Sequence, residues 1–405
     1  MTALHPVSDQ KAVTHINPTN RLASLPAYVF AWLDELKAVA RARGAKLIDL
    51  GIGSPDHPTP SAIVEAIASA YGDPTLHGYP PFRGTAQFRE AAARFMQKRF
   101  GVDVDPEHEV LCVSGAKEAV VQTTMAFVDE TSSVIVPEIY YPVHARAAQL
   151  IGGQVDHIPL RAEHGFIPDL DAIPASVLER ARLLILNYPQ NPTGAVARIA
   201  LYEKAVDLCR RHGIVLLSDL AYSELTFDGV VAPSALQVEG AKEVTIELHS
   251  FSKSFNMAGS RIGFAVGGRS LIDTLYAVRT NVGYGTPAAI QAGAALALDR
   301  ASELVPPIAR RYQERRDVVI KGFNALGWHA SPPEGTMFVW LPVPAGFSSQ
   351  EWTQHLIDRA DVVVTPGNAF GAGGEGFFRV GLVAEAAVLA TAIERLREAG
   401  IRFAA

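Results

Sequence analysis

Residues 250–264 read SFSKSFNMAGSRIGF and directly follow an apolar run, VTIELH, that predicts a buried β-strand. Lys253 thus lies just past a strand, with Ser250 and Ser252 beside it and Arg261 eight residues later. A lysine amine bonds to an aldehyde only when it is unprotonated, and burial beside other cations lowers its pKa. Two hydroxyls and a guanidinium can bind a phosphate. The stretch therefore predicts that Lys253 binds a phosphorylated aldehyde; a solvated surface lysine fits poorly with its small, apolar neighbours.

A further contribution to phosphate binding is predicted where VSGAKEAV, residues 113–120, turns from a strand into a helix. The glycine supplies the tight turn, and the helix begins with Ala116 and Lys117. Backbone N–H groups at a helix N-terminus, assisted by the helix dipole, bind phosphate oxygens. Most turns of this kind bind nothing, so this prediction depends on the other motifs.

Two other predicted strands end in polar residues. SDLAYSEL places Asp219 at the carboxyl end of a strand, the edge where open α/β sheets bind ligands, with Tyr222 three residues later. If the ligand contains a pyridine ring, an ionised aspartate beside the ring nitrogen keeps that nitrogen protonated. Taken alone, Asp219 would be interpreted as a helix cap. Lys253 follows the next predicted strand at the same edge of the sheet, and this favours a role in ligand binding for Asp219. Another predicted strand ends in a rigid turn, NYPQNPTG. Asn191 in this turn could hydrogen-bond a hydroxyl group on the ring of the ligand, together with Tyr222, or it could be an ordinary loop residue.

The order of predicted elements indicates the fold class. Between 61 and 300, helices alternate with short apolar strands such as LLILN, which is typical of a mostly parallel sheet covered on both faces. We expect an α/β fold whose large domain, residues 61–300, holds a doubly wound, mostly parallel sheet. Residues 301–405, with a long helix expected near 308–325, should form a second, smaller α+β domain together with residues 21–60. Residues 1–20 are expected to be a flexible leader.

The composition argues against several classes of protein. The 405 residues are 48% hydrophobic with a formal net charge of −6, and they lack the basic blocks of nucleic-acid or membrane-surface binding. No stretch reaches the roughly 18 to 20 apolar residues of a membrane span, and the start lacks the apolar core of a signal peptide. Cys112 and Cys209 lie in apolar contexts without metal-ligand spacing, which indicates reduced, packed thiols in a cytoplasmic protein. We expect no nucleic-acid, membrane or metal partner.

The motifs SFSKSFNMAGSRIGF, NPTG, SDLAYSEL and FFRVGL together resemble the class I/II aminotransferases of fold type I, which use pyridoxal 5′-phosphate. The resemblance spans residues 25–382. The segments LGIGSPDHPTP, HGYPPFRGTAQFREA and SGAKEA are similar to the branch that holds LL-diaminopimelate and glutamate–pyruvate (alanine) aminotransferases. The resemblance implies an enzyme that moves an amino group between an L-amino acid and a 2-oxo acid by a ping-pong mechanism, with substrates of the glutamate, alanine or diaminopimelate type.

The resemblance implies a role for each matching position. Lys253 would form the Schiff base with the cofactor, Asp219 would face the pyridine nitrogen, and Tyr141 would stack on the ring. Tyr79 matches a tyrosine that reaches the cofactor phosphate of the other subunit, which implies a homodimer with shared active sites. The other implied cofactor contacts are Asn191, Tyr222, Ala116, Lys117, Ser250, Ser252 and Arg261. The implied substrate contacts are Arg379, which would clamp the α-carboxylate, and Gly53, Tyr28 and Asn191.

The sequence departs from that branch at two places. Ala116 stands where the branch usually has serine, and YGTPAAIQ at 284–291 lacks the Phe-Thr-Pro run common there. A β-eliminating (C–S) lyase is the alternative on the same scaffold, because proton removal at Cα precedes both reactions. A non-catalytic alternative is the cofactor-binding domain of a transcription regulator, which has this same fold. Such a regulator needs a DNA-binding module ahead of the fold, and we expect no room for one. Four histidines are predicted to serve packing or capping: His57, His77, His144 and His249.

Overall fold

The computed structural model describes residues 17–23, 25–26 and 28–403, so the predicted leader lies outside the described residues up to position 16. Its largest sheet has seven strands in the order β2-β8-β7-β6-β5-β3-β4. Strand β8 is antiparallel to both of its neighbours, and the other adjacent strands are parallel. The prediction of a doubly wound, mostly parallel sheet is confirmed. The strands are β2 (Val110–Val113), β3 (Ser133–Pro137), β4 (Gln154–Ile158), β5 (Ala181–Asn187), β6 (Val215–Asp219), β7 (Thr245–Ser250) and β8 (Gly263–Gly267).

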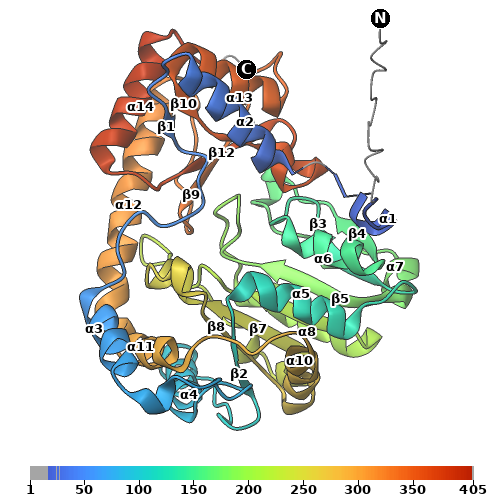
Figure 1. Cartoon of the computed structure of the whole chain (residues 1–405). Coiled ribbons are helices and arrows are strands. Elements are labelled where there is room, and N and C mark those ends of the chain that lie inside the picture. The colour runs from blue at the N-terminus through green and yellow to red at the C-terminus, as the bar shows by residue number, and fades with distance from the viewer. Residues whose placement is uncertain (1–16, 24, 27, 404–405) are drawn as a thin grey trace, which may run out of the picture.

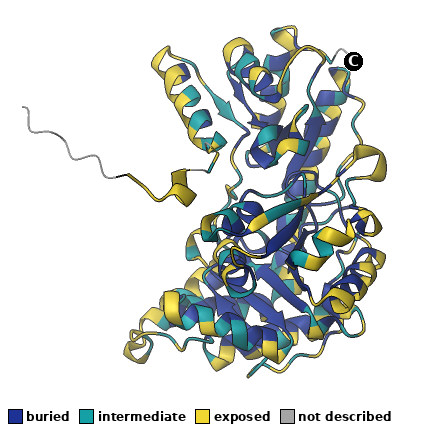
Figure 2. Ribbon diagram, turned by 90° about the vertical axis from the view of Figure 1, so that its right-hand side faces the viewer, coloured by how far each residue is buried: buried dark blue, intermediate teal, exposed yellow. Residues whose placement is uncertain are grey.

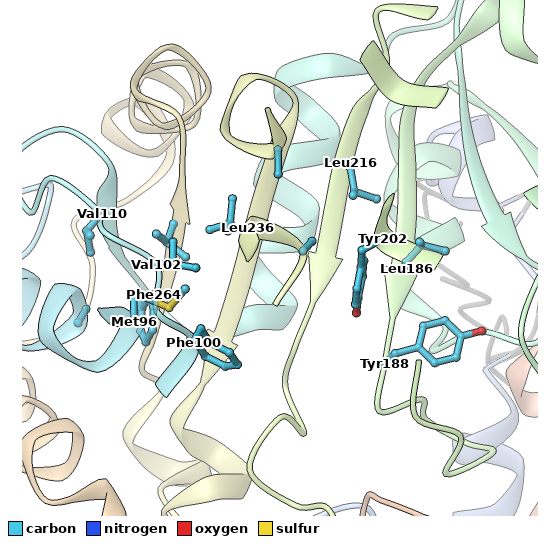
Figure 3. Packing of buried hydrophobic residues seen from close by; sticks show 14 of the residues in the cluster. Met96, Phe100, Val102, Val110, Leu186, Tyr188, Tyr202, Leu216, Leu236 and Phe264 are labelled. Atoms are coloured by element: carbon cyan, nitrogen blue, oxygen red, sulfur yellow. The ribbon is translucent and has the colours of Figure 1, made fainter. Parts of the chain in front are cut away.

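Helices cover both faces of this sheet, and its strands are buried almost throughout (Figures 1 and 2). The apolar core on one face joins strand residues to α3 (Ser61–Tyr71), α4 (Ala86–Phe100), α8 (Ile199–His212) and α11 (Ala288–Asp299). Figure 3 shows part of that core, with Met96, Phe100 and Phe264 grouped together. The core on the other face joins the strands to α5 (Ala116–Phe127), α6 (Val143–Ile151) and α10 (Arg269–Val282). Unbroken apolar strands are therefore buried from both sides, as a parallel sheet requires.

A second core lies above the large sheet in Figure 1. It surrounds an antiparallel sheet in the order β11-β12-β9 and a two-stranded parallel pair of β1 with β10. These strands are β1 (Ile48–Asp49), β9 (Phe338–Pro342), β10 (Val362–Val363), β11 (Thr365–Pro366) and β12 (Phe377–Gly381). The helices of this part of the chain are α2 (Val29–Ala42), α12 (Ala301–Ala325), α13 (Ser349–Ala360) and α14 (Ala386–Glu398). Three further helices, outside this core, are short: α1 (Asn20–Ala23), α7 (Ala175–Arg180) and α9 (Phe251–Ser254). We propose that this core and the large sheet form two domains, divided near residues 60 and 300.

Helix α12 begins earlier than predicted. Its start was expected near residue 308, but the helix runs from Ala301 through Pro306 and Pro307, although proline is unfavourable inside a helix. The carbonyl groups that lose a backbone partner to these prolines belong to Ser302 and Glu303, which are exposed and can bind water. The helix therefore continues through both prolines and links the two parts of the chain (Figure 1).

Two predictions from composition can be compared with the structure. Cys112 and Cys209 are buried and free, as expected, and burial raises the pKa of the Cys112 thiol to about 12. Within the described residues, no helix combines the length and the apolar character that crossing a membrane requires.

A buried carboxylate ties the central strands together. Glu247 on β7 is fully buried and accepts hydrogen bonds from the hydroxyl of Ser234 (2.6 Å), the backbone N–H of Ala235 (2.8 Å) and the hydroxyl of Ser218 (3.2 Å). His249 Nε2 lies 3.0 Å from the same carboxylate, and its ring stacks on Phe264. His249 therefore has the packing role that was predicted for it, directly behind Ser250.

We predict that Glu247→Ala destabilises the fold strongly, because several buried donors would lose their acceptor at once. The expected cost is about 3 kcal/mol or more, from denaturation midpoints and slopes. Glu243→Ala is the matched control, since Glu243 is an exposed partner of Arg210 and its loss should cost less than about 1 kcal/mol. Equal losses in the two variants would contradict this account of the core.

Candidate active site

One cavity of about 280 Å³ lies at the carboxyl ends of β5, β6 and β7. Parallel register brings Asn187 beside Asp219 there, so the polar residues that follow the two strands share one edge. The cavity is lined by every predicted site residue except Tyr79: Tyr28, Gly53, Ala116, Lys117, Tyr141, Asn191, Asp219, Tyr222, Ser250, Ser252, Lys253, Arg261 and Arg379. Phe30, Asn187, Ala221, Ala258 and Phe338 complete the lining.

Lys253 lies in α9, the single turn of helix that follows β7. Its Nζ donates a short hydrogen bond to the carbonyl oxygen of Gly53. Burial, and then the positive charges of Arg379 and Arg261, lower the pKa of the Lys253 amine to about 8. An amine with this pKa is unprotonated far more often near neutral pH than an ordinary lysine, as nucleophilic attack on a carbonyl requires.

Asp219 ends β6 and is almost completely buried. Its Oδ2 lies 3.0 Å from Nε2 of His144, which is also buried, and its Oδ1 accepts from the backbone N–H of Ala221 at 3.2 Å. The amide of Asn187 donates to the backbone carbonyl of Asp219 at 2.7 Å. These contacts fix the position of the carboxylate at the edge of the sheet.

The anion-binding end of the cavity is formed by the start of α5. Gly115 precedes this helix with φ of 91°, and a Cβ there would lie 2.6 Å from Nη2 of Arg261. Only glycine therefore lets the N-terminus of α5, with the N–H groups of Ala116 and Lys117, lie against this guanidinium. Ser250 also lines this cavity, so donors and positive charge gather without a carboxylate among them.

Arg379 on β12 is buried and lies between two aromatic rings, 4.0 Å from the centroid of Phe338 and 4.7 Å from that of Phe370. Its Nη1 donates to Asn191 Oδ1 at 3.0 Å, and its Nη2 donates to the Gly51 carbonyl at 3.1 Å. Burial lowers the pKa of this guanidinium to about 10, and Nε has no hydrogen-bond partner among the described residues. A buried cation without a carboxylate partner is suited to bind an anionic ligand.

Tyr79 lies outside the cavity and is 80% exposed. Its ring stacks on Tyr284 with centroids 4.1 Å apart, and Tyr284 also stacks on Phe82 at 5.4 Å. Tyr284 belongs to the segment that departs from the family pattern. Tyr79 therefore has no contact with the cavity of its own chain, and its implied role toward another subunit remains a proposal.

Comparison with known proteins gives a consistent result. The family described as aminotransferase class I and II matches residues 45–396. The chain belongs to this family. An LL-diaminopimelate aminotransferase 2 from Nostoc is 45% identical over 95% of the chain and 99% of its own length, and the LL-diaminopimelate aminotransferase of Moorella thermoacetica is 42% identical over 93% and 97%. Substrate-bound BacF from Bacillus subtilis superposes with a TM-score of 0.91, at 36% identity over 96% of this chain and 99% of that one.

The chain is thus an aminotransferase, and its site includes residues that sequence reasoning missed. His144 was assigned to packing or capping, yet it contacts the Asp219 carboxylate. It lies 75 positions from Asp219 and follows a different strand, so only its place shortly after Tyr141 could have drawn attention to it. Asn187 opens the NYPQNPTG motif but was given no role of its own, and Phe338 was not singled out, although both line the cavity.

We predict that Lys253 reacts with acetic anhydride as an amine of low pKa in the cofactor-free enzyme. Below its pKa the amine is protonated and unreactive, so the labelling rate should rise with pH, reach half its plateau at about pH 8 and level off above about pH 9. Mass spectrometry of peptides measures the rate, with exposed Lys321 as the internal reference for reagent decay. A rate that still climbs at pH 10, as for an ordinary lysine, would contradict the lowered pKa.

Proposed function

We propose that this aminotransferase binds pyridoxal 5′-phosphate through Lys253 and uses it to move amino groups between an L-amino acid and a 2-oxo acid. One observation carries the proposal: a lysine of lowered pKa lies in the same cavity as a group of anion-binding donors and a buried aspartate. These are the groups that an aldehyde, a phosphate and a pyridine nitrogen would each require.

The residues present fit this cofactor. Because residue 115 is a glycine, the start of α5 lies close to the guanidinium of Arg261. A phosphate between them could accept hydrogen bonds from the N–H groups of α5, from Ser250 and Ser252, and from the guanidinium. Ala116 contributes its backbone N–H but no hydroxyl. At the other end, Asp219 is held by His144, and Tyr141 and Tyr222 line the space between the two ends.

The chain's own residues would then perform the reaction. Bound pyridoxal phosphate supplies an aldehyde and an electron-withdrawing ring that stabilises negative charge at the substrate α-carbon. Lys253 Nζ removes the Cα proton as a general base, a task for which a pKa of about 8 is suited. The carboxylate of Asp219 would keep the ring nitrogen protonated, and Asn191 and Tyr222 would hold the ring oxygen.

The substrate α-carboxylate would bind the guanidinium of Arg379, whose orientation is fixed by its hydrogen bonds to Asn191 and Gly51. Gly53 lies beside this arginine, since a Cβ on Gly53 would lie 3.6 Å from Arg379 Nη2, and Tyr28 lines the same cavity. We propose donors and acceptors of the glutamate, alanine or diaminopimelate type. The identity of 45% to an LL-diaminopimelate aminotransferase supports testing LL-diaminopimelate with 2-oxoglutarate first.

We further propose a homodimer in which Tyr79 of one subunit reaches the cofactor phosphate of the other. The support is that Tyr79 and Tyr284 form an exposed aromatic stack beside the cavity-bearing sheet. The two buried, free thiols support a reducing, cytoplasmic environment. The comparisons give no support to the lyase alternative, because the relatives are aminotransferases.

Lys253→Ala should abolish transamination and remove the visible absorption of the enzyme incubated with pyridoxal phosphate, because the proposed covalent link is to the Lys253 amine. Turnover is measured with LL-diaminopimelate, glutamate or alanine and a 2-oxo acid. Lys321→Ala, at an exposed position of α12, is the matched control and should keep both properties. Retention of absorption and turnover in Lys253→Ala would refute the assignment.

Arg379→Lys should lower kcat/KM for the amino donor by about 100-fold, because an ammonium cannot replace the planar, two-pronged contact with a carboxylate. The dissociation constant for pyridoxal phosphate should change little, since Arg379 lies away from the phosphate-binding donors. Steady-state kinetics and a cofactor titration measure the two quantities. An unchanged kcat/KM would exclude Arg379 as the carboxylate clamp.

A further inference from the structure

Residues 51–60 form an irregular segment that runs from β1 of the small sheet to α3 beside the large one (Figure 1). Two of its carbonyl oxygens touch the reactive groups of the cavity. The Gly51 carbonyl accepts from Arg379 Nη2 at 3.1 Å, and the Gly53 carbonyl accepts from Lys253 Nζ. The position of this segment therefore affects the substrate clamp and the reactive amine together.

The segment is attached to the loop that carries Lys253. Asn256 lies three residues after Lys253, and its Nδ2 donates to the carbonyl of Pro58 at 3.4 Å. The hydroxyl of Thr59 donates in the opposite direction, to the backbone carbonyl of Asn256, at 2.9 Å. Two reciprocal contacts thus join residues 58–59 to one residue of the catalytic loop.

Asn256 is held in an unfavourable state. Its φ is 53°, in the left-handed region that residues other than glycine seldom adopt, although asparagine tolerates it better than most. The residue is only 9% exposed, and its Oδ1 is buried without a hydrogen-bond partner within the described part of the chain. Unfavourable conformations and unpaired buried atoms persist where the surrounding structure enforces them, and they concentrate at functional sites. Neither feature is explained by contact with the cavity, because Asn256 does not line it.

We propose that Asn256 and Thr59 form a latch that positions residues 51–60, and through Gly53 and Gly51 keeps Lys253 and Arg379 in their working arrangement. Both are positioning residues, since neither touches the cavity. The inference rests on the proposed roles of Lys253 and Arg379. A second anchor fixes the middle of the segment, where Asp56 binds the buried Arg315 of α12 through two hydrogen bonds of 2.8 Å. The latch is therefore the attachment to the catalytic loop, and the Asp56 pair is the attachment to the other core.

Two variants each remove one of the two contacts of the latch. Thr59→Val keeps the shape of the side chain and removes the hydroxyl, while Asn256→Gly removes the side chain and still permits a positive φ. The matched control is Thr391→Val, because the Thr391 hydroxyl donates to the Ala387 carbonyl on the exposed face of α14, far from the cavity in sequence and fold. Circular dichroism and thermal melting establish that each variant is folded.

The first measurement uses cofactor-free protein. Amide hydrogen exchange in peptides covering residues 51–60 should be about tenfold faster in Thr59→Val and Asn256→Gly than in the wild type, because the segment loses an attachment. The second measurement is a single half-reaction with amino donor, followed by loss of the visible absorption of the cofactor-loaded enzyme. Its rate should fall about tenfold, since small misplacement of reacting groups slows chemistry. The dissociation constant for pyridoxal phosphate should stay within about twofold.

The outcomes separate this inference from the proposed function. Faster exchange and a slower half-reaction in both variants, with Thr391→Val unchanged, would support the latch. Wild-type exchange and half-reaction rates in either folded variant would overturn it and leave the proposed function intact. Failure of the proposed function would appear in the wild type itself, as the absence of visible absorption with pyridoxal phosphate.

Discussion

The site depends on an excess of positive charge gathered around one cavity. Lys253, Arg261, Arg379 and Lys117 line one cavity, and Asp219 is the single acidic residue among the described residues of its lining. Arg379 is buried and Lys253 is partly buried, whereas Arg261 and Lys117 are exposed residues, and the one carboxylate of the lining cannot compensate all four cations. The pKa of Lys253 falls to about 8 and that of Arg379 to about 10, mainly through burial. Such a cavity is stabilised by anions, and a phosphate and a carboxylate are the two that the proposed reaction brings.

The fold produces this charge arrangement through strand order. Strands β5, β6 and β7 are parallel neighbours, so Asn187, Asp219 and Ser250 end at one edge although they are far apart in sequence. The second core then brings Arg379 from β12 to the same edge, and long helix α12 connects the two cores (Figure 1). Each part therefore supplies one side of the cavity, and the segment at 51–60 crosses between them. The proposed substrate clamp and the proposed cofactor attachment would therefore lie at one shared edge.

Much of this could be predicted because local sequence carries it. The apolar runs that precede Asp219 and Lys253 predicted adjacent buried strands, and the residues at their ends had to meet. The contacts that could not be predicted join distant positions: His144 with Asp219, Gly51 with Arg379, and Thr59 with Asn256. These depend on tertiary packing that no periodicity encodes. The early start of α12 was missed for another reason, since the penalty of its prolines is reduced where the affected carbonyl groups face water.

The central claim is that the enzyme moves an amino group in two separate half-reactions, with Lys253 as the reactive amine. The most direct test mixes cofactor-loaded enzyme with a ¹⁵N-labelled amino donor and no acceptor, and counts the products. This account predicts one equivalent of 2-oxo acid per active site and no free ammonia, followed by recovery of the original absorption and of ¹⁵N-labelled amino acid when a 2-oxo acid is added. Continuous release of 2-oxo acid and ammonia from the donor alone would contradict it.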